Sequence, residues 1–249
     1  MTNPTGSDTP ESAAPPAAAK VSLWEDFIDI FHSPSDVFAR RENGSFWKPL
    51  IVVTLLIGVL TFAFSGVLAP IRDAAMAKGM AAAMKANPQM TAEQAATGRK
   101  VGDIISNVGA FVFVPIAIFV IGLVTWVVGK IFDAAESISN AMLIAAYAMM
   151  PGVLGSVING VQGLLMDSAS LTSPYSIAIS PARFLNPDTT SPFLLAVLAH
   201  IDLFGIWTVA LLAIGLAVIG KIPRSRAAVA GVVLWILGLV PGLLTAARS

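Results

Sequence analysis

Six polar or helix-breaking residues interrupt long apolar stretches of the chain, and these are the residues whose types and spacing could do chemistry. An ionisable side chain in lipid is costly, so it is a functional candidate by default. Asp202 is therefore a candidate for an ion or proton pathway. The simpler interpretation, which we favour, places Asp202 near the interface, bonded to a neighbouring helix. The six residues are Tyr147, Pro151, Asn159, Gln162, His200 and Asp202.

Helical spacing limits the sites that these residues can form together. His200 and Asp202 are two residues apart, so on a helix they project about 200° away from each other and cannot share one site. Asn159 and Gln162 are three apart and face similar directions. In a membrane helix that pattern favours hydrogen bonds between helices over a ligand site.

Two further groups have simple structural interpretations. Tyr147 precedes Pro151 by four residues, and we expect its hydroxyl to bond a backbone carbonyl that the proline frees, in a packing role rather than at a hinge. Asp133 and Glu136 are three apart and could attract a cation. Because they lie close to Lys130, we interpret them as part of a solvated loop.

The motifs of common enzyme classes are missing. There is no Gly-x-Ser-x-Gly nucleophile elbow, and the two histidines, His32 and His200, are too far apart for a His-Glu-x-x-His zinc site. The chain has no cysteine, which excludes thiolate chemistry, and its formal net charge of zero gives no reason to expect nucleic-acid binding. We therefore expect no enzymatic activity, no cofactor and no metal site.

Composition indicates the environment of these residues. Hydrophobic types make up 56% of the chain and charged types 12%, against about 25% charged in a typical soluble domain. Stretches of this length and polarity predict membrane-spanning helices, because backbone groups in lipid must be satisfied within the segment. We predict an all-α membrane protein with a five-helix transmembrane bundle over residues 49–247. The expected spans are 50–69, 104–129, 141–166, 193–220 and 227–247.

The N-terminal fifth of the chain has a different character. Residues 1–20 are rich in Pro, Ala, Ser and Thr, which predicts a disordered tail. Residues 21–48 predict amphipathic juxtamembrane helices, the first of them an interfacial helix over 22–32. Its apolar face is formed at positions i, i+3, i+4 and i+7 by Trp24, Phe27, Ile28 and Phe31, and its polar face by Glu25, Asp26 and Asp29.

This acidic polar face is unusual for a helix that binds lipid, which normally carries Lys and Arg there. It favours contact with a protein partner or with the loops of the chain itself. A second helix is expected to follow, with Ser33 as its cap and Pro34 at its first position. In that helix Phe38 would point toward the membrane. The first loop, 71–103, is expected to contain two helices, with Thr91 and Gln94 forming a capping box on the second.

Orientation follows the Lys and Arg residues close to the spans. The total numbers of Lys and Arg residues in the loops on the two sides of the membrane are nearly equal. Arg40, Arg41 and Lys48 flank the first span, and residues 221–226 hold three more basic side chains in one short loop. These groups favour a cytoplasmic N-terminus and a C-terminus outside.

Three patches of sequence resemble the bacterial branch of the Yip1 family, in the same order and spacing as in that family. They are WEDFIDIFHSPSDVFARRENGSFWKPL at 24–50, AYAMMP at 146–151 and HIDLFGIWTVALLAIGLA at 200–217. The resemblance covers most of 24–244 but omits the tail and the first loop, which looks larger than usual for the family. It implies five spans and a cytoplasmic N-terminus.

The expected function is that of a non-enzymatic scaffold or interaction protein in the bacterial inner (cytoplasmic) membrane. Its partners would be the lipid bilayer and a protein that binds the N-terminal arm, and glycine-lined helices would allow a homo-oligomer. The alternative is a small transporter or channel component that uses Asp202, Asn159 and Gln162.

Overall fold

The computed structural model describes residues 22–247, and over that range the chain is helical with no strand. Residues 1–21 and 248–249 lie outside the described residues, and the expected disordered tail over 1–20 lies there. The helices are α1 Leu23–Asp29, α2 Pro34–Arg41, α3 Trp47–Ala63, α4 Ala69–Ala86, α5 Ala92–Val108, α6 Ala110–Ile131, α7 Ile138–Ala148, α8 Met150–Leu165, α9 Pro192–His200, α10 Leu203–Val218 and α11 Arg224–Ala246. Three short 3-10 helices are η1 Ser168–Ser170, η2 Pro174–Ile177 and η3 Pro181–Phe184.

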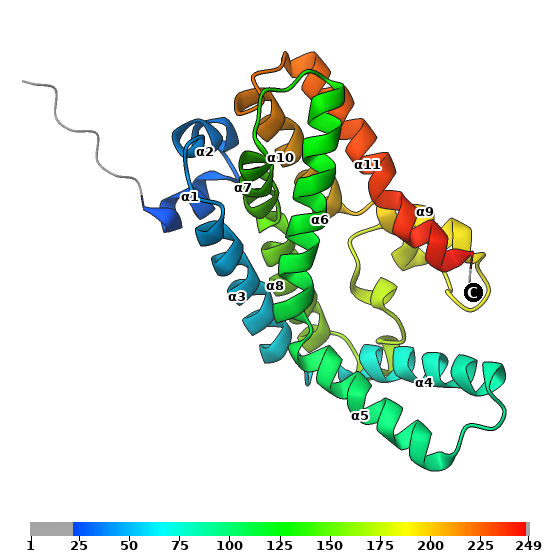
Figure 1. Cartoon of the computed structure of the whole chain (residues 1–249). Coiled ribbons are helices and arrows are strands. Elements are labelled where there is room, and N and C mark those ends of the chain that lie inside the picture. Colours follow the sequence, from blue (N-terminus) through cyan, green and yellow to red (C-terminus); the bar gives the residue numbers. More distant parts are fainter. Residues whose placement is uncertain (1–21, 248–249) are drawn as a thin grey trace, which may run out of the picture.

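Helix α7 lies at the centre of the bundle, in contact with α3, α6 and α10 (Figure 1). All of its residues from Ala141 to Ala148 are buried. Four of these eight residues are alanines, and small side chains let neighbouring helix backbones approach closely. An added Cβ at Gly122 of α6 would lie only 3.0 Å from the Cα of Met142, so this contact involves the α7 backbone itself.

The predicted spans are confirmed in part. Among the described residues, α6, the α7–α8 pair and α11 are each long and apolar enough to cross a membrane. A fourth span results if α9 and α10 count as one, although they bend by 54°. Helix α3 is apolar but only 17 residues long. The count of five spans is therefore not confirmed by length and composition.

Two predicted spans are interrupted within their predicted bounds. The stretch 50–69 stops being helical after Ala63, and α4 starts at Ala69 with Pro70 in its first turn. The stretch 193–220 breaks because Asp202 begins a new helix as its N-cap. Conversely, residues 104–108 belong to α5 rather than to the span that follows.

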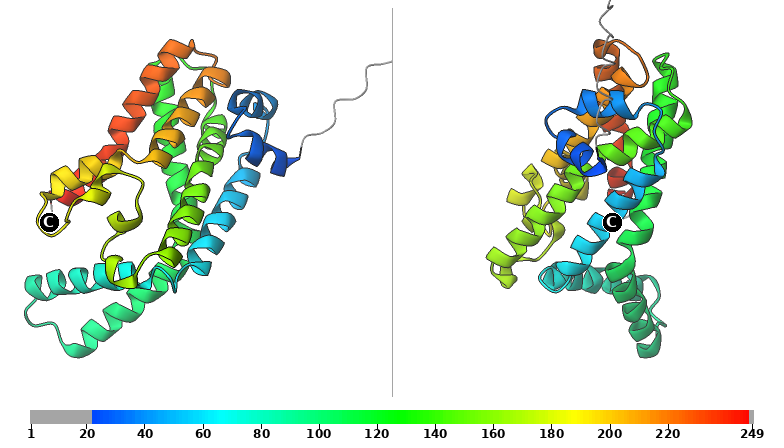
Figure 2. Two further views of the ribbon diagram at one scale, coloured as in Figure 1. Left: turned by 180° about the vertical axis from the view of Figure 1, so that it is seen from behind. Right: turned by 90° about the vertical axis from the view of Figure 1, so that its left-hand side faces the viewer.

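The polar first loop forms a helical hairpin, α4–α5, at the opposite end of the bundle from α1 and α2 (Figures 1 and 2). The predicted capping box is confirmed: Gln94 N–H donates to Thr91 Oγ1 at 3.2 Å, and Thr91 N–H donates to Gln94 Oε1 at 2.9 Å. Pro34 begins α2 as predicted, but the Ser33 hydroxyl makes no capping hydrogen bond. We call residues 22–42, with α1 and α2, the arm.

Candidate functional site

A buried carboxylate joins the arm to the bundle. Asp26 of α1 is fully buried. Its Oδ1 accepts a hydrogen bond from Nε of Arg40 at 2.7 Å, and its Oδ2 accepts one from Nε of Arg41 at 2.6 Å and one from the hydroxyl of Tyr147 at 3.0 Å. Asp29 also pairs with Arg40. We call Asp26, Asp29, Arg40, Arg41 and Tyr147 the arm cluster.

Local structure places the two arginines. Both lie in the last turn of α2, where positive charge interacts favourably with the helix dipole, and Asp26 lies in the first turn of α1, where negative charge does. Burial alone would lower the pKa of Arg40, but its hydrogen bonds to Asp29 and Asp26, together with the negative charges of these two residues, outweigh burial and raise the pKa. Charge-assisted bonds of this kind are among the strong hydrogen bonds in proteins.

Tyr147 does not have the partner that we predicted. Its hydroxyl bonds Asp26, 121 residues earlier in the chain, rather than a carbonyl freed by Pro151. Its ring lies between two phenylalanines of the arm, with centroids 5.7 Å from Phe27 and 6.4 Å from Phe38. Pro151 lies in the first turn of α8, just after the interruption at Met149. Tyr147 therefore has a packing role, as predicted, but the segment that it packs against is the arm.

The apolar face of the interfacial helix is rotated from its predicted position. Phe27 is 4% exposed and Ile30 is fully buried, whereas Trp24 is 62% and Ile28 64% exposed. Phe31 packs on Trp207 of α10, with ring centroids 5.1 Å apart. Asp26, predicted on the polar face opposite the apolar residues, instead lies on the side of α1 that packs on the bundle, because Arg40, Arg41 and Tyr147 satisfy its charge.

The second arm helix also faces the bundle. Val37 and Phe38 are fully buried, and α2 packs on α10. The prediction that Phe38 points toward the membrane was therefore wrong. Pro34 is partly exposed at the start of this helix.

The structure places His200 and Asp202 in separate local contacts at the break between α9 and α10. Asp202 Oδ1 accepts hydrogen bonds from the backbone N–H groups of Phe204 and Gly205, both at 3.0 Å. Nε2 of His200 lies 2.7 Å from the carbonyl oxygen of Trp235 in α11. Asp202 thus caps its own helix, and His200 ties α9 to α11.

Asn159 and Gln162 do not act together either. Gln162 donates to the carbonyl of Ile177 at 2.9 Å and accepts from Arg183 at 2.6 Å, so it fixes α8 to the irregular segment that contains η2 and η3. Asn159 lies beside a cavity near the start of α4. Its Oδ1 atom is buried without a hydrogen-bond partner among the described residues.

Glu136 is a buried acid that sequence reasoning placed in a solvated loop. It is 2% exposed, and neither carboxyl oxygen has a hydrogen-bond partner among the described residues. Lys130 turns its Nζ toward the carbonyls of Ala134 and Glu136 instead, each at 2.7 Å. Burial raises the pKa of the Glu136 carboxyl, an effect that the charge of Lys130 partly offsets. Asp133 is exposed and pairs with Arg226, so the two acids form no common site.

Comparison with known proteins identifies the family of the chain. The family model described as the Yip1 domain matches residues 28–245. The chain is 26% identical to "Membrane protein YknW" of Bacillus subtilis (strain 168) over 223 residues, which are 88% of this chain and 87% of that protein. No solved structure matches the chain.

Removing the central carboxylate tests the arm cluster. We expect Asp26→Ala to destabilise the docked arm by about 1–3 kcal/mol, because two charge-assisted hydrogen bonds are lost and the buried Tyr147 hydroxyl loses its partner. Hydrogen exchange in detergent or nanodiscs should then show loss of amide protection over 23–41. Asp36→Ala, which removes an exposed carboxylate from α2, is the matched control and should leave protection unchanged. Equal protection in both variants would show that the cluster does not hold the arm.

Glu136 predicts a pH dependence of stability. Its pKa is raised in the folded state, so the unfolded chain ionises first as pH rises above the ordinary carboxyl value of about 4.3. Stability is lost from that pH upward until the folded-state carboxyl has also ionised. We therefore expect Glu136→Gln to raise the thermal midpoint at pH 7.5 and to leave it unchanged at pH 4. Glu93→Gln, at an exposed position of α5, should not show this pattern, and a lower midpoint for Glu136→Gln at pH 7.5 would contradict it.

Proposed function

Because the chain belongs to the Yip1 family, and the matched region spans the bundle and most of the arm, we propose that it is a non-enzymatic interaction protein of the bacterial cytoplasmic membrane. The docked arm presents the surface that binds a protein partner. The single observation that carries this proposal is the pair of large apolar side chains, Trp24 and Ile28, that the arm leaves exposed. Four other apolar residues of the arm, Phe27, Ile30, Val37 and Phe38, are buried.

The geometry of this pair supports a protein partner. Trp24 and Ile28 are four residues apart on α1, so they lie on the same face of the helix. Tryptophan is enriched among the residues that dominate binding energy at protein interfaces. The exposed acid Glu25 lies beside them, and an acidic neighbour disfavours anionic lipid. Anchoring by the arm cluster would also reduce the ordering cost of binding.

The contacts of the other polar residues favour an interaction protein over a transporter. Asp202, His200 and Gln162 are each engaged in a local structural contact that fixes a helix end or a loop. These contacts account for the cost of placing each polar group among apolar helices. The three contacts lie in different parts of the fold and involve different partner residues.

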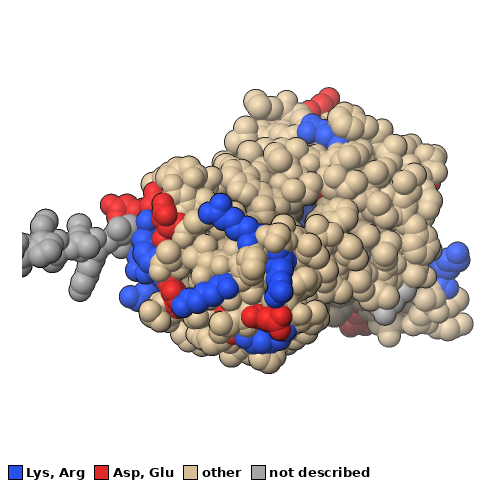
Figure 3. Space-filling view, turned by 90° about the horizontal axis from the view of Figure 1, so that it is seen from above, with Lys and Arg blue, Asp and Glu red and all other residues tan. Residues whose placement is uncertain are grey.

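For the topology we propose five spans, with α3 as the first and α9–α10 as the fourth. The arm, the α6–α7 loop and the α10–α11 loop lie together at one end of the bundle (Figures 1 and 2). Viewed from that end, basic and acidic side chains are mixed over the part beside the arm, while most of the remaining surface is uncharged (Figure 3). Basic residues of short loops favour the cytoplasmic side. The basic residues of these three segments, of the adjoining ends of α6 and α11 and of the start of α3 are Arg40, Arg41, Lys48, Lys130, Lys221, Arg224 and Arg226.

The chain has no cysteine, so single cysteines report topology directly. We expect a membrane-impermeant maleimide to label Gln89→Cys, in the α4–α5 turn, in intact bacterial spheroplasts. Ser35→Cys, in α2, should react only after permeabilisation, because the arm is proposed to be cytoplasmic. Both positions are exposed. The reverse pattern would contradict the proposed orientation, and labelling of both in intact spheroplasts would contradict five spans.

The partner surface is tested with a photoreactive residue at Ile28 in native membranes. We expect one discrete crosslinked protein, and we expect Trp24→Ser to reduce its yield about tenfold, as loss of an interface hot spot would. The matched control carries the photoreactive residue at Ala39, which is exposed on α2 and should give no such product. Crosslinks to lipid only, or the same products from both positions, would contradict a protein partner at this face.

A further inference from the structure

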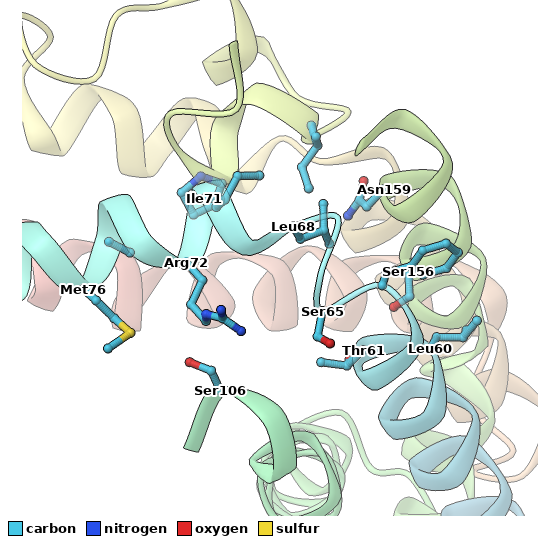
Figure 4. A pocket seen from close by; sticks show the side chains of 14 residues that line it. Leu60, Thr61, Ser65, Leu68, Ile71, Arg72, Met76, Ser106, Ser156 and Asn159 are labelled. Carbon is cyan, nitrogen blue, oxygen red and sulfur yellow. The ribbon is translucent and has the colours of Figure 1, made fainter. Parts of the chain in front are cut away.

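A cavity of about 590 Å³ lies at the end of the bundle opposite the arm. Its walls come from α3, α4, α5, α8 and η2, so segments distant in sequence build it together (Figure 4). Most of the lining is apolar, and the larger apolar side chains are Leu60, Phe64, Leu68, Ile71, Met76 and Ile177.

Two polar groups of this cavity have unmet hydrogen-bonding capacity. Nε of Arg72 and Oδ1 of Asn159 are both buried without a hydrogen-bond partner among the described residues. The same Nε atom forms an ion pair with Oδ1 of its chain neighbour Asp73, at 3.5 Å, but this contact is not a hydrogen bond. Figure 4 shows the Arg72 side chain reaching from α4 into the opening, toward the Ser106 hydroxyl of α5. Buried polar groups normally find a hydrogen-bond partner, so Arg72 Nε and Asn159 Oδ1 can each still form a hydrogen bond with a ligand in this cavity.

The cavity lies where the apolar helix α3 meets the charged α4–α5 hairpin, the arrangement expected at a boundary between lipid and water. Helices α3 and α6 are apolar, and α3 ends beside the cavity. Helices α4 and α5 carry charged side chains, among them Arg72, Lys78, Arg99 and Asp103. A charged residue at this level can meet a lipid headgroup while the apolar wall meets acyl chains.

We propose that this cavity binds a phospholipid with a phosphate and a free hydroxyl in its headgroup, as in phosphatidylglycerol. The guanidinium of Arg72 would hold the phosphate, a geometry for which arginine is well suited. A headgroup hydroxyl would donate to Asn159 Oδ1, and the apolar side chains would contact the upper acyl chains. This proposal is independent of the arm and its partner, because none of its residues belongs to either.

The test measures lipid retained by the full-length protein, purified from nanodiscs of equal phosphatidylglycerol and phosphatidylcholine, by native mass spectrometry. We expect wild type to retain phosphatidylglycerol selectively and Arg72→Gln to retain about tenfold less, as loss of a charged hydrogen bond implies. A second variant, Ala75→Trp, fills the cavity from its lining and should have the same effect. The matched controls are Arg99→Gln and Ala82→Trp, both at exposed positions of the hairpin, which should retain lipid as wild type does.

Three results would overturn the proposal. One is unchanged phosphatidylglycerol retention in both Arg72→Gln and Ala75→Trp. Another is an equal loss of phosphatidylglycerol retention in the matched controls, which would show that retention depends on surface charge or side-chain size in general rather than on this cavity. The third concerns the source of the phosphate: inorganic phosphate or glycerol 3-phosphate that displaces the lipid at equimolar concentration would identify a soluble anion as the ligand. Variants are compared only after size exclusion shows the same monodisperse species.

Discussion

The carboxylate of Asp26 is removed from water and held between two guanidinium groups and a phenol, and the position of the whole arm depends on that arrangement. A buried charge is tolerated only with partners of this quality. Once it is satisfied, the same side of α1 can also bury Phe27 and Ile30. Trp24 and Ile28 are then left outside, so the exposed surface that we propose as functional is a geometric consequence of the buried ion cluster.

The fold class could be predicted because it depends on composition, which the sequence shows directly. Helix limits within apolar stretches were harder to predict. The chain stops being helical after Ala63 inside a mostly apolar run, where Ser65, Gly66 and Pro70 were weak signals. The break before α10 had a signal in Asp202, but an acid that caps a helix and an acid in a pathway look alike until its backbone partners are known.

Only part of the candidate site could be predicted from the sequence, for a related reason. Periodicity placed Asp26 on an acidic polar face of α1, and Arg40 and Arg41, 14 and 15 residues after Asp26, had no visible link to it. Tyr147 was singled out, yet its partner is far away in sequence. The cavity needed side chains from four helices and η2, so Asn159 alone could not indicate it. Contacts that join distant segments require the fold.

The separation between Asp26 and Tyr147 also orders events during synthesis. The arm leaves the ribosome early, whereas the residue that receives it follows 121 positions later. At translation rates of about 5–20 residues per second, this delay is roughly 6–24 s. During that interval the two arginines can neutralise Asp26 within the arm itself, but the arm has no site to dock on. Docking is therefore a late step, and a docked arm marks a molecule whose central helix, α7, is already in place.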